Sequence, residues 1–461
     1  MEAFDDEGVF WLPGRNADQR TGRLTFDPAE GATLKIIGGF GEIHEQSKDH
    51  TRLRRIHGIA GRRNLTLDGC SYADSGFEAS GVPHDIYHVS RVIADALFDE
   101  NADLAFDKCL VTFDQLAHWI DRSGIKVRQV PQLAFPPDRV TIEFEPPRDE
   151  TATIHDQEEL RLTSRWSLGG DNITTACLHQ RTYLELRYPG SRPLDNILGD
   201  VGYLQDLLTL ATNAPTAPLE ITLWQAAKEM KYYAGQLAER VRLDAPQSEG
   251  RILFKFSDIG GLPTIARWVN IARGYQIVVG SLLSIRYASG LYIESQFNNV
   301  ISAAETFHRL RFPNRIRPKE EFKEFRRELI EAVPQEHKEW LNIQTQHANE
   351  PRLRDRLTKM ATYAGDAFTA VCDEPELWVR VVTESRNRLT HRDESRAMPF
   401  EPGDLYLLTE SVFMLVMLCL FRECQMDDRT LSAIAESKSI ESLRTKLTPV
   451  ILRLHARITS K

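Results

Sequence analysis

The chain has 461 residues, a formal net charge of −9 at pH 7, 42% hydrophobic residues and 27% charged residues. These proportions are typical of a folded globular protein and exclude a chain that is disordered throughout. The length leaves room for two or three domains.

The amino terminus and the cysteines narrow the class of protein further. Met1–Glu7 is acidic and has neither the basic nor the apolar segment of a signal peptide. The longest apolar run, Val412–Phe421, has about half the residues that a membrane span needs. The six cysteines form no CxxC pair. We therefore expect a cytoplasmic protein without a membrane span, a disulfide framework, a metal or another cofactor.

Residues 1–190 are predicted to form a β-rich domain. Short alternating apolar runs closed by turn residues predict strands at Gly22–Pro28, Ala32–Gly38 and Asn64–Cys70, and the last run enters a turn at Asp68-Gly69. Further strands are expected at Leu104–Val111, Arg139–Phe144, Glu158–Trp166 and Arg181–Arg187, with one short helix within Phe113–Ile120.

One histidine pair in this domain could suggest a metal site. His84 and His88 lie four residues apart, with Asp85 beside His84. No third ligand accompanies them, so we interpret them as a structural pair in a loop.

From Pro193 the apolar spacing changes to three and four residues, which predicts helices. A helical connecting region, 191–288, is expected to hold helices at Leu194–Ala211, Gln225–Arg240 and Thr264–Tyr287. Residues 289–461 are expected to form an all-α bundle with helices at Tyr292–Leu310, Lys319–Val333, Arg352–Phe368, Glu376–Thr390, Leu405–Cys424 and Ile440–Ala456. The predicted fold class is therefore α+β and multidomain, with the β-rich part first. The helix containing Val412–Phe421 is apolar on every face, so it should lie at the centre of the bundle or partly against a second subunit.

The most informative motif is Arg386-Asn387 followed by His391. The arginine offers a fixed charge and a fork of donors that suits a phosphate. The histidine exchanges a proton near neutral pH. Together they can cleave RNA without a metal. The spacing also occurs at Arg52 and His57, but that pair lies in a region that reads as strands and loops. Only Arg386 has a polar residue directly after it, a helical run before it and an apolar helix beyond.

Helical geometry limits how this motif can work. Positions five apart on a helix differ by about 140°, so Arg386 and His391 cannot point the same way within one helix. Asn387 and His391 share a face. We expect the helix to fray at Leu389–Arg392, so that His391 can turn toward the arginine.

Several charged neighbours have two readings each. Glu384 is either a support for the site or a solvated helix residue. Glu305, three residues before His308 on the first bundle helix, either lies near the site or does not take part. Residues 291–461 hold 26 basic and 26 acidic residues, so this part is neutral and can bind RNA locally. The remaining candidates either form an RNA-facing ridge or balance Asp393 and Glu394: Arg388, Arg392 and Arg396.

These residues resemble the HEPN superfamily, whose active members carry an Arg-x4–6-His motif in a helical bundle. The longer layout is similar to the ApeA group of antiphage proteins, in which a β-rich domain precedes a HEPN domain. The residues that carry this likeness are Phe10-Trp11-Leu12-Pro13-Gly14, Gly22-Arg23-Leu24, Leu116-Ala117-His118-Trp119 and the helix Ala303–Arg309.

The resemblance implies a metal-independent endoribonuclease that acts as a homodimer or higher oligomer and aborts phage infection. Arg386, Asn387 and His391 would be its catalytic residues, RNA (possibly tRNA) its substrate, and a phage-derived molecule its trigger.

Two alternatives stay open. The chain could be a non-catalytic HEPN protein that binds RNA or a partner and is regulated by its amino-terminal domain. The β-rich domain could also bind a ligand through Trp11 and Trp119, although core packing explains both residues more simply.

Overall fold

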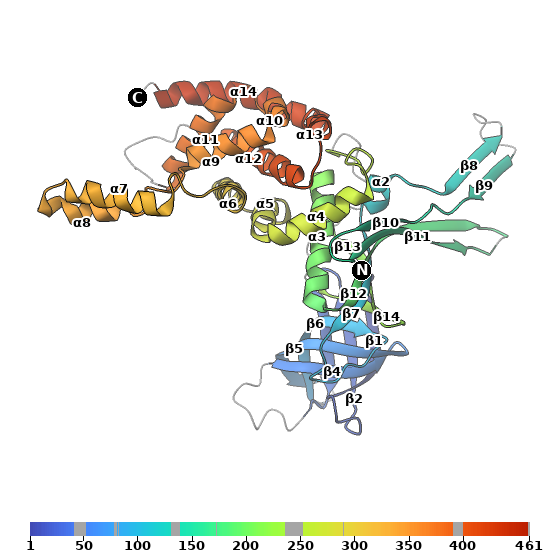
Figure 1. Cartoon of the computed structure of the whole chain (residues 1–461). Coiled ribbons are helices and arrows are strands. Elements are labelled where there is room, and N and C mark those ends of the chain that lie inside the picture. The colour runs from blue at the N-terminus through green and yellow to red at the C-terminus, as the bar shows by residue number, and fades with distance from the viewer. Residues whose placement is uncertain are drawn as a thin grey trace. The chain divides into compact units, whose positions relative to one another are not determined.

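The structure is a computed structural model that describes residues 1–40, 52–77, 81, 83–130, 139–171, 173–235, 252–288, 290–390 and 400–459 (Figure 1). The chain folds into two compact units. The first comprises Met1–Ser248 and Lys255–Asn270, and the second comprises Glu249–Phe254 and Ile271–Lys461. The predicted boundaries after residues 190 and 288 differ from this division and stay predictions.

The first unit is built on a twelve-stranded antiparallel sheet, part of which closes on itself. The strand order is β10-β11-β12-β7-β13-β14-β6-β3-β2-β1-β4-β5, and β5 also pairs with β6. This extra pairing closes six strands into a barrel: β1 (Phe4–Trp11), β2 (Arg20–Asp27), β3 (Gly31–Ile37), β4 (Arg52–Ala60), β5 (Arg63–Phe77) and β6 (Pro83–Ala94).

The sheet continues from β6 through six further strands: β14 (Lys228–Tyr233), β13 (Pro218–Gln225), β7 (Ala105–Phe113), β12 (Cys177–Pro193), β11 (Glu159–Gly169) and β10 (Glu150–Thr153). Helix α3 (Leu194–Thr212) packs on β7 and β12, with the short α2 (Leu116–Ile120) beside it. A separate two-stranded sheet pairs β8 (Ile125–Val130) with β9 (Arg139–Phe144).

The alternation read from the sequence forms the barrel wall. On β2, Leu24 and Phe26 are buried while the residues between and beside them are more exposed, and Leu34 and Ile36 do the same on β3. Successive side chains of a strand point to opposite faces, so one face of each strand lines the core. The predicted β-rich fold of the first unit is confirmed.

Three local predictions in this unit were wrong. Gly69 adopts a φ of +67° but does not end the strand, because β5 continues to Phe77 with pairing on both sides of the glycine. His84 and His88 lie on β6 and not in a loop. The helix expected at Gln225–Arg240 is wrong for the residues described, because Lys228–Tyr233 forms strand β14.

The β13–β14 hairpin explains that last error. A two-residue turn at Ala226-Ala227 joins the strands, and Ala226 has the positive φ of +54° that such turns need. Met230 and Tyr232 are buried on alternate positions. The hydrogen-bonding partners are β13 and β6, and β6 lies more than a hundred residues earlier in the chain, outside any local window.

The second unit is helical. After α4 (Leu262–Gly274), which crosses the division between the units, its helices are α5 (Gln276–Tyr287), α6 (Ile293–Arg311), α7 (Lys319–Glu331), α8 (Gln335–Gln344), α9 (Leu353–Ala364), α10 (Asp366–Val371), α11 (Pro375–Thr390), α12 (Pro402–Glu423), α13 (Asp428–Ala435) and α14 (Lys438–Thr459). The predicted helical bundle is confirmed. The single helix expected at Thr264–Tyr287 is instead two helices, which separate at Tyr275.

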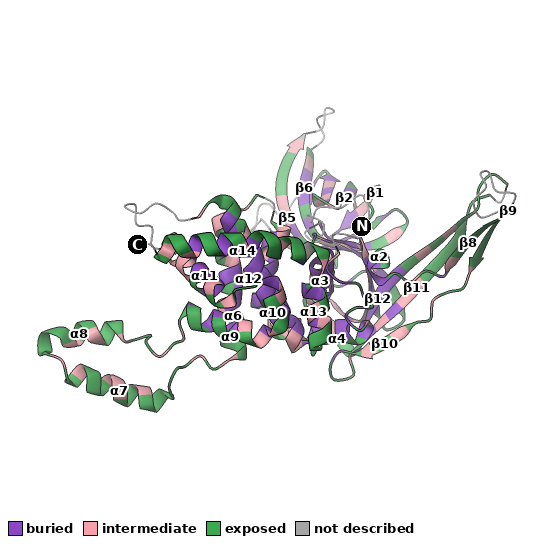
Figure 2. Ribbon diagram, turned by 90° about the horizontal axis from the view of Figure 1, so that it is seen from above, coloured by how far each residue is buried: buried purple, intermediate pink, exposed green. Residues whose placement is uncertain are grey.

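Helix α12 occupies the centre of this bundle. Every residue from Leu408 to Phe421 is buried, and α6, α9, α10, α13 and α14 pack around it (Figure 2). Among the residues described, this is the one helix long and apolar enough to cross a membrane by length and composition. Its burial is that of a core helix in a soluble protein, so its length and composition alone are weak evidence for a span.

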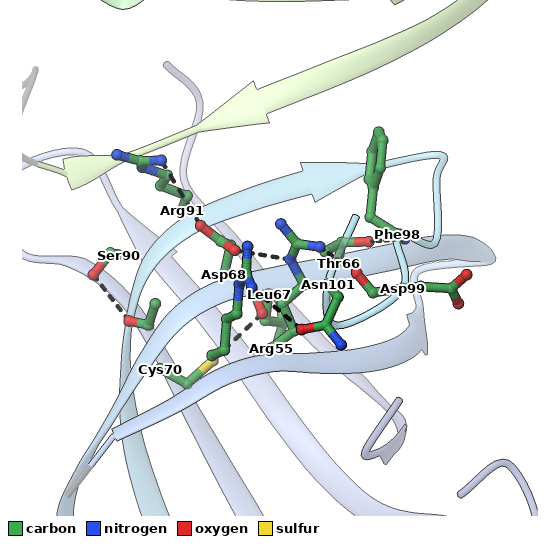
Figure 3. A network of polar contacts seen from close by, with 12 residues as sticks. Arg55, Thr66, Leu67, Asp68, Cys70, Ser90, Arg91, Phe98, Asp99 and Asn101 are labelled. Atoms are coloured by element: carbon green, nitrogen blue, oxygen red, sulfur yellow. Dashed lines mark hydrogen bonds and ion pairs between the residues drawn. The ribbon is translucent and has the colours of Figure 1, made fainter. Parts of the chain in front are cut away.

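A buried ion-pair network ties the barrel strands together (Figure 3). The Arg55 side chain is only 2% exposed and pairs with Asp68 at 2.9 Å. Its guanidinium also donates to the Asp99 carbonyl. Asp68 lies 3.8 Å from Arg91, which pairs in turn with the exposed Asp195. Arg55 therefore depends on Asp68 for the compensation of a buried charge.

We predict that Asp68→Asn lowers the free energy of unfolding of the first unit by about 3 kcal/mol, because it leaves the Arg55 charge buried without a carboxylate. Asp195→Asn is the matched control. Its partner Arg91 is partly exposed and its own side chain is 73% exposed, so we expect a loss of less than about 1 kcal/mol. Urea unfolding followed by circular dichroism measures both variants. Equal losses in the two would contradict the assignment.

Candidate active site at the end of α11

Helix α11 is positioned by its apolar face. Trp378, Val381, Val382 and Ser385 recur at helical spacing and are buried. The Trp378 indole donates to Ser411 Oγ of α12 at 2.7 Å and its ring packs edge-on against Phe368 of α10. The helix also packs on α9 and α14. These contacts fix the direction in which α11 ends.

Arg386 and Asn387 lie in the last turn of α11, and both are half-buried. Among the residues described, no partner hydrogen-bonds to either side chain. The Arg386 carbonyl accepts from Thr390 Oγ1 at 2.9 Å. Cations are stabilised at this end of a helix by its dipole. The Arg386 guanidinium therefore remains available for an anion.

Three of the predicted site residues, His391, Arg392 and Arg396, lie outside the described residues. The described part of α11 stays helical through Thr390. The predicted fraying is therefore wrong for Leu389 and Thr390.

Arg388 differs from Arg386. Its Nε donates to Glu384 Oε1 at 2.8 Å, one helical turn earlier, and its side chain is only 14% exposed. Glu384 is thus the ion-pair partner of Arg388. This geometry favours a structural pair over an RNA-facing contact for Arg388, and it places Glu384 in support of the helix end.

Glu305 belongs to a different cluster, around a buried arginine on α9. His308 of α6 accepts at Nδ1 from Arg356 Nη1 at 3.1 Å. Both residues are buried, and the negative charges of Glu305 and Glu350 act on Arg356. Burial, then the charges of Arg356, Lys359 and Arg309, lower the pKa of His308 to about 4. His308 is therefore neutral near pH 7 and serves as an acceptor.

The sequence analysis did not identify Arg356 as part of this cluster. Its partner His308 is 48 residues away, so no local pattern could have indicated the pair.

The other arginine–histidine spacings have structural or surface explanations. His57 is buried, and its Nε2 lies 2.7 Å from the Phe98 carbonyl. His155 is exposed and pairs with its neighbour Asp156. Trp11 and Trp119, considered for a ligand pocket, are both buried in the first unit. Among the residues described, no three His, Cys, Asp or Glu side chains form a group suited to a metal ion.

The fold and this site define a β-rich domain followed by a HEPN-type helical domain, and comparison with known families agrees. A family model described as ApeA N-terminal domain 1 matches residues 7–268, and one described as Apea-like HEPN matches residues 298–430. The first match alone covers more than half of the 461 residues, so the chain belongs to the ApeA family. It is a HEPN-type defence protein, and HEPN domains are generally nucleases. No curated protein and no solved structure matches the chain.

The low pKa of His308 predicts a pH-dependent stability of the second unit. Between about pH 6.5, the ordinary value, and about pH 4, the unfolded histidine binds a proton that the folded one does not. The free energy of unfolding therefore falls as the pH falls through this window.

We expect His308→Gln, which keeps an acceptor for Arg356 but cannot titrate, to flatten this pH dependence. His155→Gln removes an exposed histidine and should leave it unchanged. Melting temperatures measured between about pH 7 and about pH 4 test the pair of variants. A His308→Gln curve parallel to the wild type would contradict the expectation.

Proposed function

We propose that this protein is a metal-independent endoribonuclease of an antiphage abortive-infection system. The observation that carries the proposal is the placement of Arg386 and Asn387. Both side chains lie half-buried and unpaired within the described residues, in the last turn of α11, one residue pair before the described helix ends. His391 follows in the sequence, and the domain matches the Apea-like HEPN model.

The chemistry needs positioning more than a cofactor. The ribose 2′-hydroxyl attacks the adjacent phosphorus, the bond to the 5′-oxygen breaks, and a cyclic phosphate and a 5′-hydroxyl result. Arg386 would stabilise the charge that develops on the phosphorane oxygens. His391 would accept the proton of the 2′-hydroxyl or donate one to the leaving oxygen. Asn387 would orient His391 or hydrogen-bond the phosphate.

One copy supplies one histidine, whereas the reaction uses a base and an acid. Two-fold symmetry would bring two motifs to one composite site, with the second histidine from another copy. We therefore propose a homodimer or higher homo-oligomer acting on RNA, possibly tRNA, in the cytoplasm. The first unit would hold the nuclease silent until a phage-derived trigger arrives.

Replacing Arg386 or His391 by alanine should reduce RNA cleavage by on the order of 100- to 10,000-fold, because each change removes one catalytic function. Arg386→Lys should recover only part of the loss, since lysine keeps the charge but not the planar fork. Arg380→Ala is the matched control, because Arg380 is an exposed arginine on the same helix and its loss should leave the rate unchanged.

The measurement is the appearance of new 5′-hydroxyl ends in a total RNA pool, with a chelator present, in cells or extracts that make the protein. Equal cleavage by the wild type and both alanine variants would refute the proposal. Binding of RNA by a folded wild-type protein, with no new ends in infected cells, would favour the non-catalytic alternative.

A further inference from the structure

The helical hairpin formed by α7 and α8 extends away from the other helices of the second unit (Figures 1 and 2). None of the residues of either helix is buried. Its inner contacts form a single thin layer. Arg326 Nε donates to Thr345 Oγ1 at 3.1 Å, and its Nη2 donates to the Asn342 carbonyl at 2.5 Å. The hairpin therefore has an inner face but no core.

Such a hairpin is not expected to be stable without a cover. Its helices have 13 and 10 residues, and isolated helices of about this length are marginal in water. The outer face carries large apolar side chains: Trp340 is 63% exposed, Ile343 is 60% exposed and Leu329 is 37% exposed. Trp340 and Ile343 lie three residues apart, so they share one face of α8. We call Leu329, Trp340 and Ile343 the outer patch.

The charges around this patch suit a second copy of the same surface. Residues 315–344 contain seven basic and seven acidic side chains, so two such hairpins carry no net repulsion. On α7, Lys319 and Arg326 lie on one side of the apolar face, while Glu321 and Glu328 lie on the other. Opposite charges of two copies can thus face each other across an apolar contact, as they do beside coiled-coil seams.

We propose that the α7–α8 hairpins of two copies of this chain pack together through the outer patch and form a four-helix bundle. A two-fold axis makes each patch its own partner and buries Trp340 and Ile343 of both copies. The inference rests on the proposed function in one respect: this contact would supply the second copy that a composite site requires. The contact itself involves no residue of the Arg386–His391 motif.

Light scattering and sedimentation velocity on the full-length protein test the contact. The wild type should have twice the mass of the chain at micromolar concentration. Trp340→Glu and Ile343→Glu should each weaken the dimer by roughly tenfold or more, because each places a charge in the apolar contact. Gln335→Glu adds the same charge to an exposed position at the start of α8 and should leave the dimer intact. Circular dichroism confirms that the variants keep their helix content.

A monomeric wild type would overturn the proposal, and so would dimers of equal strength in all three variants. Arg386→Ala separates this proposal from the nuclease: it should lose RNA cleavage and remain a dimer. A dimer that the patch variants disrupt, in a protein that never cleaves RNA, would support the hairpin contact and refute the nuclease. Cleavage that persists in a patch variant shown to be monomeric would support the contact and refute the composite site.

Discussion

The second unit depends on the burial of α12. Its side chains from Leu408 to Phe421 are apolar or hydrogen-bonded and have no solvent-exposed face. Burying each large apolar side chain contributes about 1.5–3 kcal/mol, so the helices around α12 gain most of their stability by covering it. Helix α11 joins this arrangement through the hydrogen bond from Trp378 to Ser411. The position of the candidate active site therefore follows from the packing of a helix that takes no part in the chemistry.

Within α11, helical phase gives two nearby arginines different environments. Arg386 and Arg388 are separated by one residue, which turns their side chains about 200° apart. Arg388 lies against Glu384 and is nearly buried, while Arg386 has no partner among the described residues. A charge that is already paired is poorly placed to hold a phosphate. The helix therefore divides structural and anion-binding roles between two identical side chains.

The same argument distinguishes the motif from its coincidental copy in the first unit. His57 has the same spacing from an arginine, but the barrel buries it against the Phe98 carbonyl. Its neighbour Arg55 is also taken up by the barrel, in the pair with Asp68. Charged side chains inside the first unit thus have structural partners. Spacing alone does not define a site, because the same residues can stabilise a fold where partners are close.

The sequence by itself determined the elements whose patterns are local. Alternation at Leu24, Phe26, Leu34 and Ile36 indicated the barrel strands β2 and β3, and three- and four-residue spacing indicated α3, α6, α11, α12 and α14. It also located Arg386 and Asn387 near the end of a helix. Only the tertiary structure decided that Lys228–Tyr233 is a strand, that β5 passes through Gly69, that Arg356 bonds His308 and that α7 and α8 stand without a core. In each case the deciding partner, or its absence, involves residues far away in the sequence, and hydrogen bonds and burial depend on distance in space.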